Sequence, residues 1–197
     1  MLDAGLALLE ERGYEGFTIA AVCERAHVVP RVLYARVDNK EALFLAVYEY
    51  GIARVNRAAA VFADDRQWCD LPPGQVVRKA VREVVDLFQR HEAFMRSIVR
   101  ISGVHEEVNR RGSRYSQELG NAFSRRLLDV RDRIDGPDPE TVIRVAYNTV
   151  FSAVIMRVAY GPAFATAPVD DGTFCETLTT MVLRYLFAPN DNRAAMA

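Results

Sequence analysis

The sequence has few cysteines that could cross-link the fold, and no excess of basic or acidic side chains. Its three cysteines, Cys23, Cys69 and Cys175, are odd in number, far apart and without a C-x-x-C pair, so neither a disulfide framework nor a cysteine zinc site is predicted. Basic and acidic side chains balance at 25 and 26, which leaves no global positive field. With 197 residues, half of them hydrophobic, the chain can bury a core without such cross-links. It is predicted to be globular, and any nucleic-acid binding must come from a local patch.

Long hydrophobic runs and catalytic motifs are also missing. The longest charge-free apolar run, residues 145–156, includes three polar residues and is too short to span a bilayer, and no basic residue precedes Arg12. We therefore expect a cytoplasmic protein with no membrane partner. No two glycines stand closer than three positions, which excludes G-x-G and P-loop cradles, and neither G-x-S-x-G nor H-E-x-x-H occurs. The pattern predicts no catalytic residues, no cofactor and no metal.

Two histidine–glutamate pairs are the nearest approach to acid–base or metal-binding groups. They are His91–Glu92 and His105–Glu106. Adjacent residues on a helix diverge by about 100° and do not readily share a site. We interpret both pairs as surface residues.

Hydrophobic periodicity predicts helices along almost the whole chain. Apolar residues recur at spacings of three and four, and no alternating run is bounded by hairpin signals, so we expect an all-α protein. Helices are predicted over residues 1–12, 19–26, 30–36, 40–63, 75–90, around 94–101, 104–134, 139–160 and 173–187. The helix over 139–160 is apolar almost all round, which indicates burial on more than one side. Seven arginines between 110 and 133 are predicted to lie largely on a solvated face.

The first three predicted helices have the size and spacing of a helix-turn-helix. Thr18 is a good N-cap for the second helix, residues 27–29 form the turn, and Pro30 suits the first position of the third helix. Many helical domains contain such corners, so the geometry alone identifies no family. The residue types at particular positions are more specific, and these positions are 1–14, 17–19, Val22, Ala26, Val28, 33–34 and 39–43. Over residues 1–47 this pattern resembles the DNA-binding region of TetR-type transcriptional regulators.

The resemblance implies that the third helix enters the major groove of DNA. Three residues would face base edges by position: Arg31, Val32 and Arg36. Arginine can read guanine with two hydrogen bonds, and valine can contact a thymine methyl group. Three residues would lie against phosphates: Thr18, Tyr34 and Lys40. Hydroxyls and a lysine at a helix N-terminus suit phosphate oxygens. The alternative is that Tyr34 packs on the bundle and the arginines are merely solvated.

Several positions depart from the family pattern. The family usually has Gly, Ser, Gly and Phe where this chain has His27, Val29, Arg31 and Val37, so the turn lacks a small residue and the third helix lacks a polar N-cap. Residues 1–50 carry five basic and eight acidic side chains, a net charge of −3, which weakens non-specific attraction to DNA. Within residues 23–40, however, four basic side chains accompany two acidic ones. A local basic patch therefore remains.

The resemblance divides the chain into a helix-turn-helix domain, residues 1–47, and an effector-binding and dimerisation bundle, residues 48–197. Apolar bulk in the second part exceeds what one helix seam needs, and tyrosine hydroxyls offer polar anchors, which favours a hydrophobic or aromatic small-molecule effector. The predicted effector-binding residues are Phe88, Phe94, Ile98, Tyr115, Phe123, Tyr147 and Phe151. For any one of them, ordinary core packing is the alternative.

The two apolar helices near the C-terminus predict a homodimer. Segments 139–160 and 173–187 would form a four-helix interface with their copies, and we place Val154 and Met181 in that seam. Two-fold pairing would set two recognition helices on a nearly palindromic duplex operator. The sequence therefore predicts a DNA-binding regulator, a repressor released by its effector. The alternatives are a helical ligand-binding or interaction dimer that has lost DNA binding, and a helical-bundle enzyme for which no catalytic constellation can be named.

Overall fold

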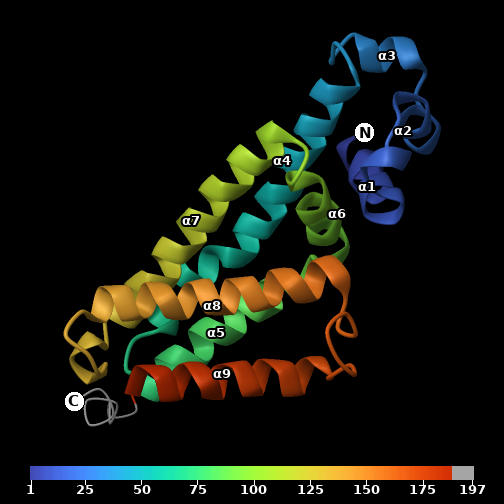
Figure 1. The fold of residues 1–197 in the computed structure, drawn as a ribbon. Coiled ribbons are helices and arrows are strands. Elements are labelled where there is room, and N and C mark those ends of the chain that lie inside the picture. The colour runs from blue at the N-terminus through green and yellow to red at the C-terminus, as the bar shows by residue number, and fades with distance from the viewer. Residues whose placement is uncertain (188–197) are drawn as a thin grey trace. The chain divides into compact units, whose positions relative to one another are not determined.

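The structure is a computed structural model that describes residues 1–187, and α-helices dominate those residues (Figure 1). The α-helices are α1 Leu2–Gly16, α2 Ile19–Arg25, α3 Pro30–Tyr34, α4 Lys40–Ala59, α5 Pro73–Arg90, α6 Glu92–Ser102, α7 Glu106–Leu128, α8 Pro139–Tyr160 and α9 Asp171–Phe187. Short 3₁₀ segments cover Ala60–Ala63, Asp65–Gln67 and Arg131–Arg133. The all-α prediction is confirmed. The end of the predicted second domain, residues 188–197, lies outside the described residues.

The chain forms two compact units. Unit 1 comprises Met1–Ala58 and Arg90–Ser113, and unit 2 comprises Ala59–Gln89 and Arg114–Ala197. Unit 1 extends beyond the predicted domain of residues 1–47 because α6 packs on α1, where the Ser97 hydroxyl donates to the Leu9 carbonyl at 2.8 Å. The functional boundary at residue 47 stays a prediction.

Local chemistry sets the helix ends in unit 1. Gly13 has φ 64°, a conformation that favours glycine, and it kinks α1 where a glycine terminus is predicted, although helical structure continues to Gly16. The Thr18 hydroxyl accepts a hydrogen bond from the Ala21 N–H at 3.1 Å, which confirms the predicted N-cap of α2. The core of the unit includes Leu8, Leu9, Phe17, Val22, Leu33, Leu43, Phe44, Val47, Tyr48 and Phe94.

The third helix ends earlier than predicted. α3 stops at Tyr34, and the N–H groups of Arg36 and Val37 both donate to the Leu33 carbonyl, at 2.9 and 3.1 Å. The next helix, α4, begins at Lys40, six residues after the end of α3. Asn39 caps its N-terminus, because its Oδ1 accepts a hydrogen bond from the Ala42 N–H at 2.8 Å. The third helix thus ends two residues before the predicted end near residue 36, and Arg36 lies in the turn that follows α3.

The turn between α2 and α3 carries two of the four departures from the family pattern, His27 and Val29. His27 has φ 53°, in the left-handed region where a β-carbon is disfavoured. Val29 precedes α3 at the N-cap position, and its side chain makes no capping hydrogen bond. The missing polar N-cap is thus visible in the structure.

A polar side chain at the N-cap of α3 should stabilise the protein. In Val29→Ser, the hydroxyl can accept a hydrogen bond from the first turn, so we expect the free energy of unfolding to rise by about 1 kcal/mol. Urea unfolding with an unchanged m value would measure the gain. Val104→Ser is the matched control, because Val104 is exposed and caps no helix. An unchanged midpoint for Val29→Ser would show that the cap bond does not form.

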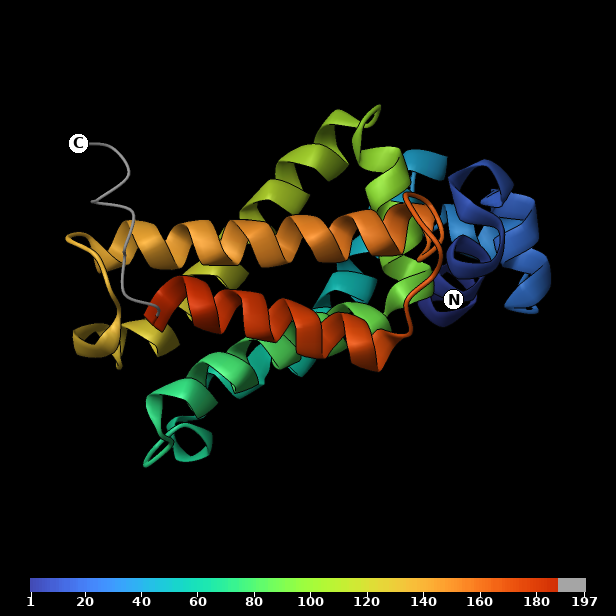
Figure 2. The same cartoon turned by 60° about the horizontal axis from the view of Figure 1, so that its bottom comes forward.

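Unit 2 is a bundle of α5, the C-terminal part of α7, α8 and α9, with α8 and α9 side by side (Figures 1 and 2). The buried side chains include Val77, Val81, Val84, Phe88, Phe123, Leu127, Ile143, Val150, Val154, Leu178, Val182 and Leu186. Val154 is only 2% exposed, so its predicted place in an intermolecular seam is wrong. It belongs to the core of the single chain.

Arg126 is a second correction in unit 2. It is buried rather than on the predicted solvated face. Its Nε donates to the Phe62 carbonyl at 2.7 Å, its Nη2 is 2.7 Å from Asp65 Oδ1, and its guanidinium lies 5.4 Å from the Trp68 ring centre. A buried arginine is tolerated here because its charge is paired and its donors find acceptors.

The helix α8 is long and apolar enough to cross a membrane by length and composition alone, and 39% of its most apolar window is buried. Core helices of soluble proteins pass the same test, so this is weak evidence for a membrane span. The sequence predicts that α8 is buried on more than one side. In the single chain one side of α8 is buried, and the side with Val145, Met156 and Tyr160 is exposed.

Candidate DNA-binding and effector-binding sites

The helix α3 buries one side chain, Leu33, and exposes the others. Val32 and Tyr34 are 43% and 55% exposed, and Val29, at the N-cap position before the helix, is 63% exposed. Tyr34 therefore does not pack into the core, contrary to the alternative interpretation of the sequence. All three predicted base-facing residues, Arg31, Val32 and Arg36, lie on the open surface of unit 1.

The basic residues around α3 differ in how far their charge is neutralised. Arg25 makes two hydrogen bonds to Glu11, at 2.5 and 2.6 Å, and this pairing lowers the pKa of Glu11. Neither Arg31 nor Arg36 has an ion-pair partner within residues 1–187. The local basic patch is thus carried by Arg31 and Arg36, together with Lys40.

The three predicted phosphate contacts have different surroundings. The Thr18 oxygen is occupied as an acceptor by the N-cap bond, and its hydroxyl hydrogen is left for an outside acceptor. Tyr34 is exposed. Lys40 is held by Tyr14: its Nζ donates to the Tyr14 carbonyl at 3.3 Å and lies 4.4 Å from the centre of the Tyr14 ring. Lys40 is therefore positioned by the end of α1 rather than free to rotate.

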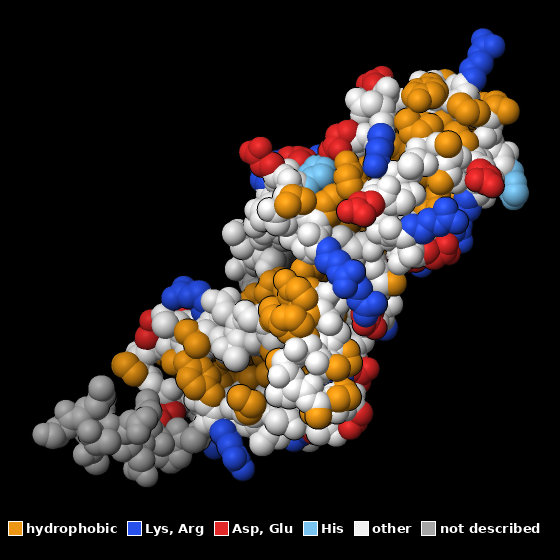
Figure 3. All heavy atoms as spheres, turned by 45° about the vertical axis from the view of Figure 1, so that its right-hand side comes forward, with side chains coloured by type: hydrophobic (Ala, Val, Ile, Leu, Met, Phe, Trp, Pro, Cys, Tyr) orange, Lys and Arg blue, Asp and Glu red, His pale blue; other side chains and the backbone are white. Residues whose placement is uncertain are grey.

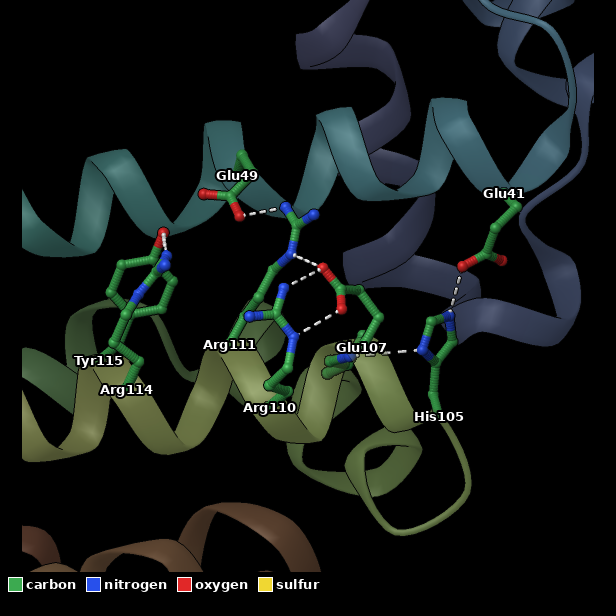
Figure 4. Close-up of polar contacts among 9 residues, drawn as sticks. Glu41, Glu49, His105, Glu107, Arg110, Arg111, Arg114 and Tyr115 are labelled. Carbon is green, nitrogen blue, oxygen red and sulfur yellow. Dashed lines mark hydrogen bonds and ion pairs between the residues drawn. The ribbon is translucent and has the colours of Figure 1, made fainter.

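A polar cluster next to Lys40 is not predicted by the sequence (Figure 4). His105, interpreted as a surface residue, is largely buried, with its Nε2 2.8 Å from Glu41 Oε1. The other oxygen of Glu41, Oε2, accepts from the Tyr14 hydroxyl at 3.2 Å. Burial, and then the Glu41 carboxylate, raise the pKa of Tyr14. No sequence signal relates His105 to Glu41, because His105 directly precedes α7, whereas Glu41 lies in the first turn of α4, far away in the chain.

A second set of ion pairs lies farther along α7 (Figure 4). Arg111 pairs with Glu49 of α4 and with Glu107, and Arg110 binds both oxygens of Glu107, at 2.7 and 2.9 Å. Hydrogen bonds from the two arginines lower the pKa of Glu107 to about 2. The start of α7 is therefore tied to α4 at two levels.

Four predicted effector-binding residues meet in unit 2. The rings of Phe88 and Phe151 are 5.7 Å apart, those of Phe151 and Tyr147 5.6 Å, and those of Tyr147 and Phe123 5.5 Å. They join α5, α8 and α7 into one aromatic cluster. Burial raises the pKa of Tyr147, whose hydroxyl donates to the Ser116 carbonyl at 2.8 Å.

The close approach of α7 and α8 at this cluster depends on a glycine. A β-carbon at Gly120 would lie 2.7 Å from Tyr147 Cε1, closer than real contacts allow. Tyr115, also a predicted effector-binding residue, instead accepts a hydrogen bond from Arg114 at 3.1 Å. Its ring lies under the Arg114 guanidinium at 4.9 Å.

The remaining two predicted effector-binding residues belong to unit 1. Phe94 is buried beside Gly51 and Tyr48, with the Tyr48 ring centre 6.5 Å away, and Ile98 is buried on the same helix. Within one compact unit, the structure therefore unites Phe88, Phe123, Tyr147 and Phe151 but not Phe94 or Ile98. Aromatic residues look alike in the sequence whichever core they join.

An apolar surface covers α8, α9 and the loop between them (Figure 3). We call it the α8–α9 face and define it by its exposed large hydrophobic residues: Val145, Met156, Tyr160, Phe164, Val169, Met181 and Tyr185. Each is at least 42% exposed, and the Tyr160 and Phe164 rings stack at 4.5 Å. Met181, predicted from the sequence to lie in a dimer seam, is on this face, and its place in a seam stays a prediction. Exposed apolar patches of this kind mark interaction surfaces.

Within residues 1–187, no group of three or more His, Cys, Asp or Glu side chains is placed to hold a metal ion.

An exposed helix-turn-helix, followed along the chain by a helical bundle, is the arrangement of a DNA-binding transcriptional regulator. The family model for bacterial regulatory proteins of the tetR family matches residues 1–47, and the tetracyclin repressor-like C-terminal domain matches residues 72–186. The chain belongs to the tetR family. It is a DNA-binding transcriptional regulator with an effector-binding C-terminal domain.

Solved structures share the fold across nearly the whole chain. A TetR-like transcriptional regulator from Rhodococcus sp. RHA1 is 19% identical with a TM-score of 0.67, covering 93% of this chain and 91% of that one. The TetR family regulator PfmR from Thermus thermophilus is 15% identical, TM-score 0.63, with 93% and 96% covered. The Thermus thermophilus repressor FadR, solved with lauroyl-CoA, is 18% identical, TM-score 0.59, with 96% and 94% covered. No curated protein sequence matches the chain.

Proposed function

We propose that the protein is a cytoplasmic homodimeric repressor that binds a nearly palindromic duplex operator and leaves it when a hydrophobic or aromatic effector binds. The observation that carries the DNA-binding part is the exposure of α3: its base-facing candidates Arg31 and Val32, with Arg36 in the turn beyond it, lie on the surface, and neither arginine is ion-paired within residues 1–187. In this proposal residues 1–47 form the DNA-binding domain and residues 48–197 the effector-binding and dimerisation domain. The family is regulatory, and we propose no enzymatic activity.

The proposed occupant of the α8–α9 face is a second copy of the chain. The composition of the surface supports this proposal, because the exposed side chains that define the face on α8 and α9 are apolar. The neighbouring surface of α5 and α9 is charged instead, with ion pairs of Arg78 and Arg82 to Glu176. A two-fold axis through the face would pair α8 and α9 with their copies in a four-helix seam. It would also duplicate α3, which is what a palindromic operator requires.

The aromatic cluster of Phe88, Phe123, Tyr147 and Phe151 supports an apolar effector. Its polar groups are few, and the Tyr147 oxygen can still accept a hydrogen bond while it donates to Ser116. The Thermus repressor bound to lauroyl-CoA offers an example of an acyl ligand on this fold. Acyl-CoA thioesters and small aromatic acids are therefore the first probes for a release screen.

Selection of bound DNA from a random duplex pool tests the DNA-binding part directly. We expect an enriched motif with two inverted half-sites, centred about one helical turn or a multiple of it apart. A pool that gains no motif over repeated rounds would favour the alternative, a ligand-binding helical dimer that has lost DNA binding.

Substitutions in the proposed DNA surface should separate base reading from phosphate binding. Arg31→Ala, or Arg36→Ala, should relax specificity at one base position per half-site, costing about 1–3 kcal/mol there if the contact is bidentate. Lys40→Ala should instead weaken all duplexes alike and lower the slope of log K against log salt. Motifs selected by the variants, together with salt titrations, would distinguish the two roles. An unchanged motif for both arginine variants would refute the base-reading role.

A further inference from the structure

The corner between α6 and α7 is joined to the proposed DNA surface by a continuous set of contacts within unit 1. Figure 4 shows the first of them, between His105 and Glu41. His105, the last residue of that corner, contacts Glu41 in the first turn of α4. Glu41 accepts a hydrogen bond from Tyr14. The carbonyl and ring of Tyr14 in turn hold the Lys40 ammonium. Three contacts therefore separate His105 from the lysine proposed to bind phosphate.

Both nitrogens of His105 are engaged. Its Nδ1 accepts from the Val108 N–H at 3.3 Å, so the imidazole caps the N-terminus of α7. Because Nδ1 is an acceptor, Nε2 carries the hydrogen that faces Glu41. The ring packs against Phe44 at 5.4 Å and Tyr14 at 6.0 Å, which fixes its plane. A shift of the start of α7 would therefore move the partner of Glu41.

We propose that His105 and Glu41 are positioning residues for DNA binding, because they hold Tyr14, and through it Lys40, in the arrangement that faces phosphate. The inference rests on the proposed function. It adds that the α6–α7 corner, which contacts no DNA, sets the phosphate affinity of the helix-turn-helix. α7 begins directly after His105 and continues to Tyr115 and Phe123 of unit 2, so it contains two of the predicted effector-binding residues.

The chain contains a matched control for the contact between His105 and Glu41. Glu49 of α4 also binds α7, through Arg111, but it lies about two helical turns beyond Glu41, farther along α4 from Lys40. If any tie between α4 and α7 sufficed, loss of the Glu49 pair would weaken DNA binding as well. If the proposal is right, only the tie at Glu41 matters.

His105→Asn is the central variant, because asparagine can still cap α7 but is too short to keep the bond to Glu41. On the operator obtained by selection, we expect its Kd to rise roughly 2- to 13-fold, the factor of one ordinary hydrogen bond. The salt slope should also fall, because a weakened phosphate contact releases fewer ions.

Further variants test the other contacts of this set. Tyr14→Phe, which removes only the hydroxyl bound to Glu41, should lower operator affinity in the same way. Glu41→Gln keeps one oxygen that can accept from His105 Nε2, and its NH2 group can donate to the Tyr14 hydroxyl oxygen. It should therefore restore binding relative to Glu41→Ala, and Glu49→Ala should match the wild type.

A double-mutant cycle of His105→Asn with Lys40→Ala tests whether the effect of His105 on DNA binding passes through Lys40. In that background, His105→Asn should change neither the Kd nor the salt slope further, because its effect passes through Lys40. Thermal unfolding of each variant checks that the fold is kept, and Tyr14→Phe replaces His105→Asn if the latter unfolds. Wild-type Kd and slope for both variants, or an equal loss in Glu49→Ala, would overturn the positioning role. A wild-type chain that binds no selected duplex would overturn the proposed function and this role together.

Discussion

Met181→Glu is expected to convert the proposed dimer into a folded monomer. Met181 is 58% exposed on the α8–α9 face, so a carboxylate there is harmless in the single chain. In a two-fold seam it would be buried without a partner, twice. An unpaired buried charge costs about 3–5 kcal/mol, which raises the dimer Kd by at least about a hundredfold. Sedimentation velocity at micromolar concentration would measure the change, and operator affinity should fall with it.

Two variants keep that result interpretable. Val104→Glu also replaces an exposed apolar side chain by a charge, but outside unit 2, and it should sediment like the wild type. Val154→Asp should instead abolish cooperative folding, because Val154 lies in the core of the single chain. An intact dimer for Met181→Glu would place the interface on another surface.

Operator and effector are expected to weaken each other's binding by the same factor. An inducer must bind the conformation that does not bind DNA more tightly, since equal affinity for both states shifts nothing. A typical coupling of about 1–3 kcal/mol corresponds to a roughly 5- to 150-fold change in each Kd. Titrating a ligand found by the release screen, with and without saturating operator, measures the factor. Phe151→Ala, in the aromatic cluster, should lose ligand affinity and keep operator affinity.

Reciprocity supplies the internal check of this prediction. The factor by which ligand weakens operator binding must equal the factor by which operator weakens ligand binding. Identical ligand dissociation constants in both titrations would mean that the ligand site is uncoupled from DNA. The inducer role would then have to be abandoned for that ligand.

Periodic features were predictable from the sequence. α8 has the predicted bounds, 139–160, because Asp138 and Pro139 start it and Gly161 ends it. The N-cap at Thr18 and the break at Gly13 follow from local chemistry in the same way. The helix-turn-helix was recognisable because its residues, and not only its spacing, match the family over residues 1–47.

Features that depend on distant partners were not predictable. Arg126 has the spacing of an outward arginine, and only the position of Asp65 and Phe62 in the fold makes its burial favourable. Val154 lies on α8, and a helix that is apolar almost all round gives no contrast to separate its inner from its outer face. The contact of His105 with Glu41 likewise depends on how α4 and α7 pack in unit 1.

The specificity ratio for the selected operator tests the central claim most directly. It is the Kd for a scrambled duplex of the same composition divided by the Kd for the operator, both measured with the wild-type chain at physiological salt. A DNA-binding regulator that reads bases through α3 should give a ratio of at least about 10³, falling towards one in the Arg31→Ala, Arg36→Ala double variant. Equal affinity of the wild type for both duplexes would contradict sequence-specific recognition and leave only a helical ligand-binding dimer.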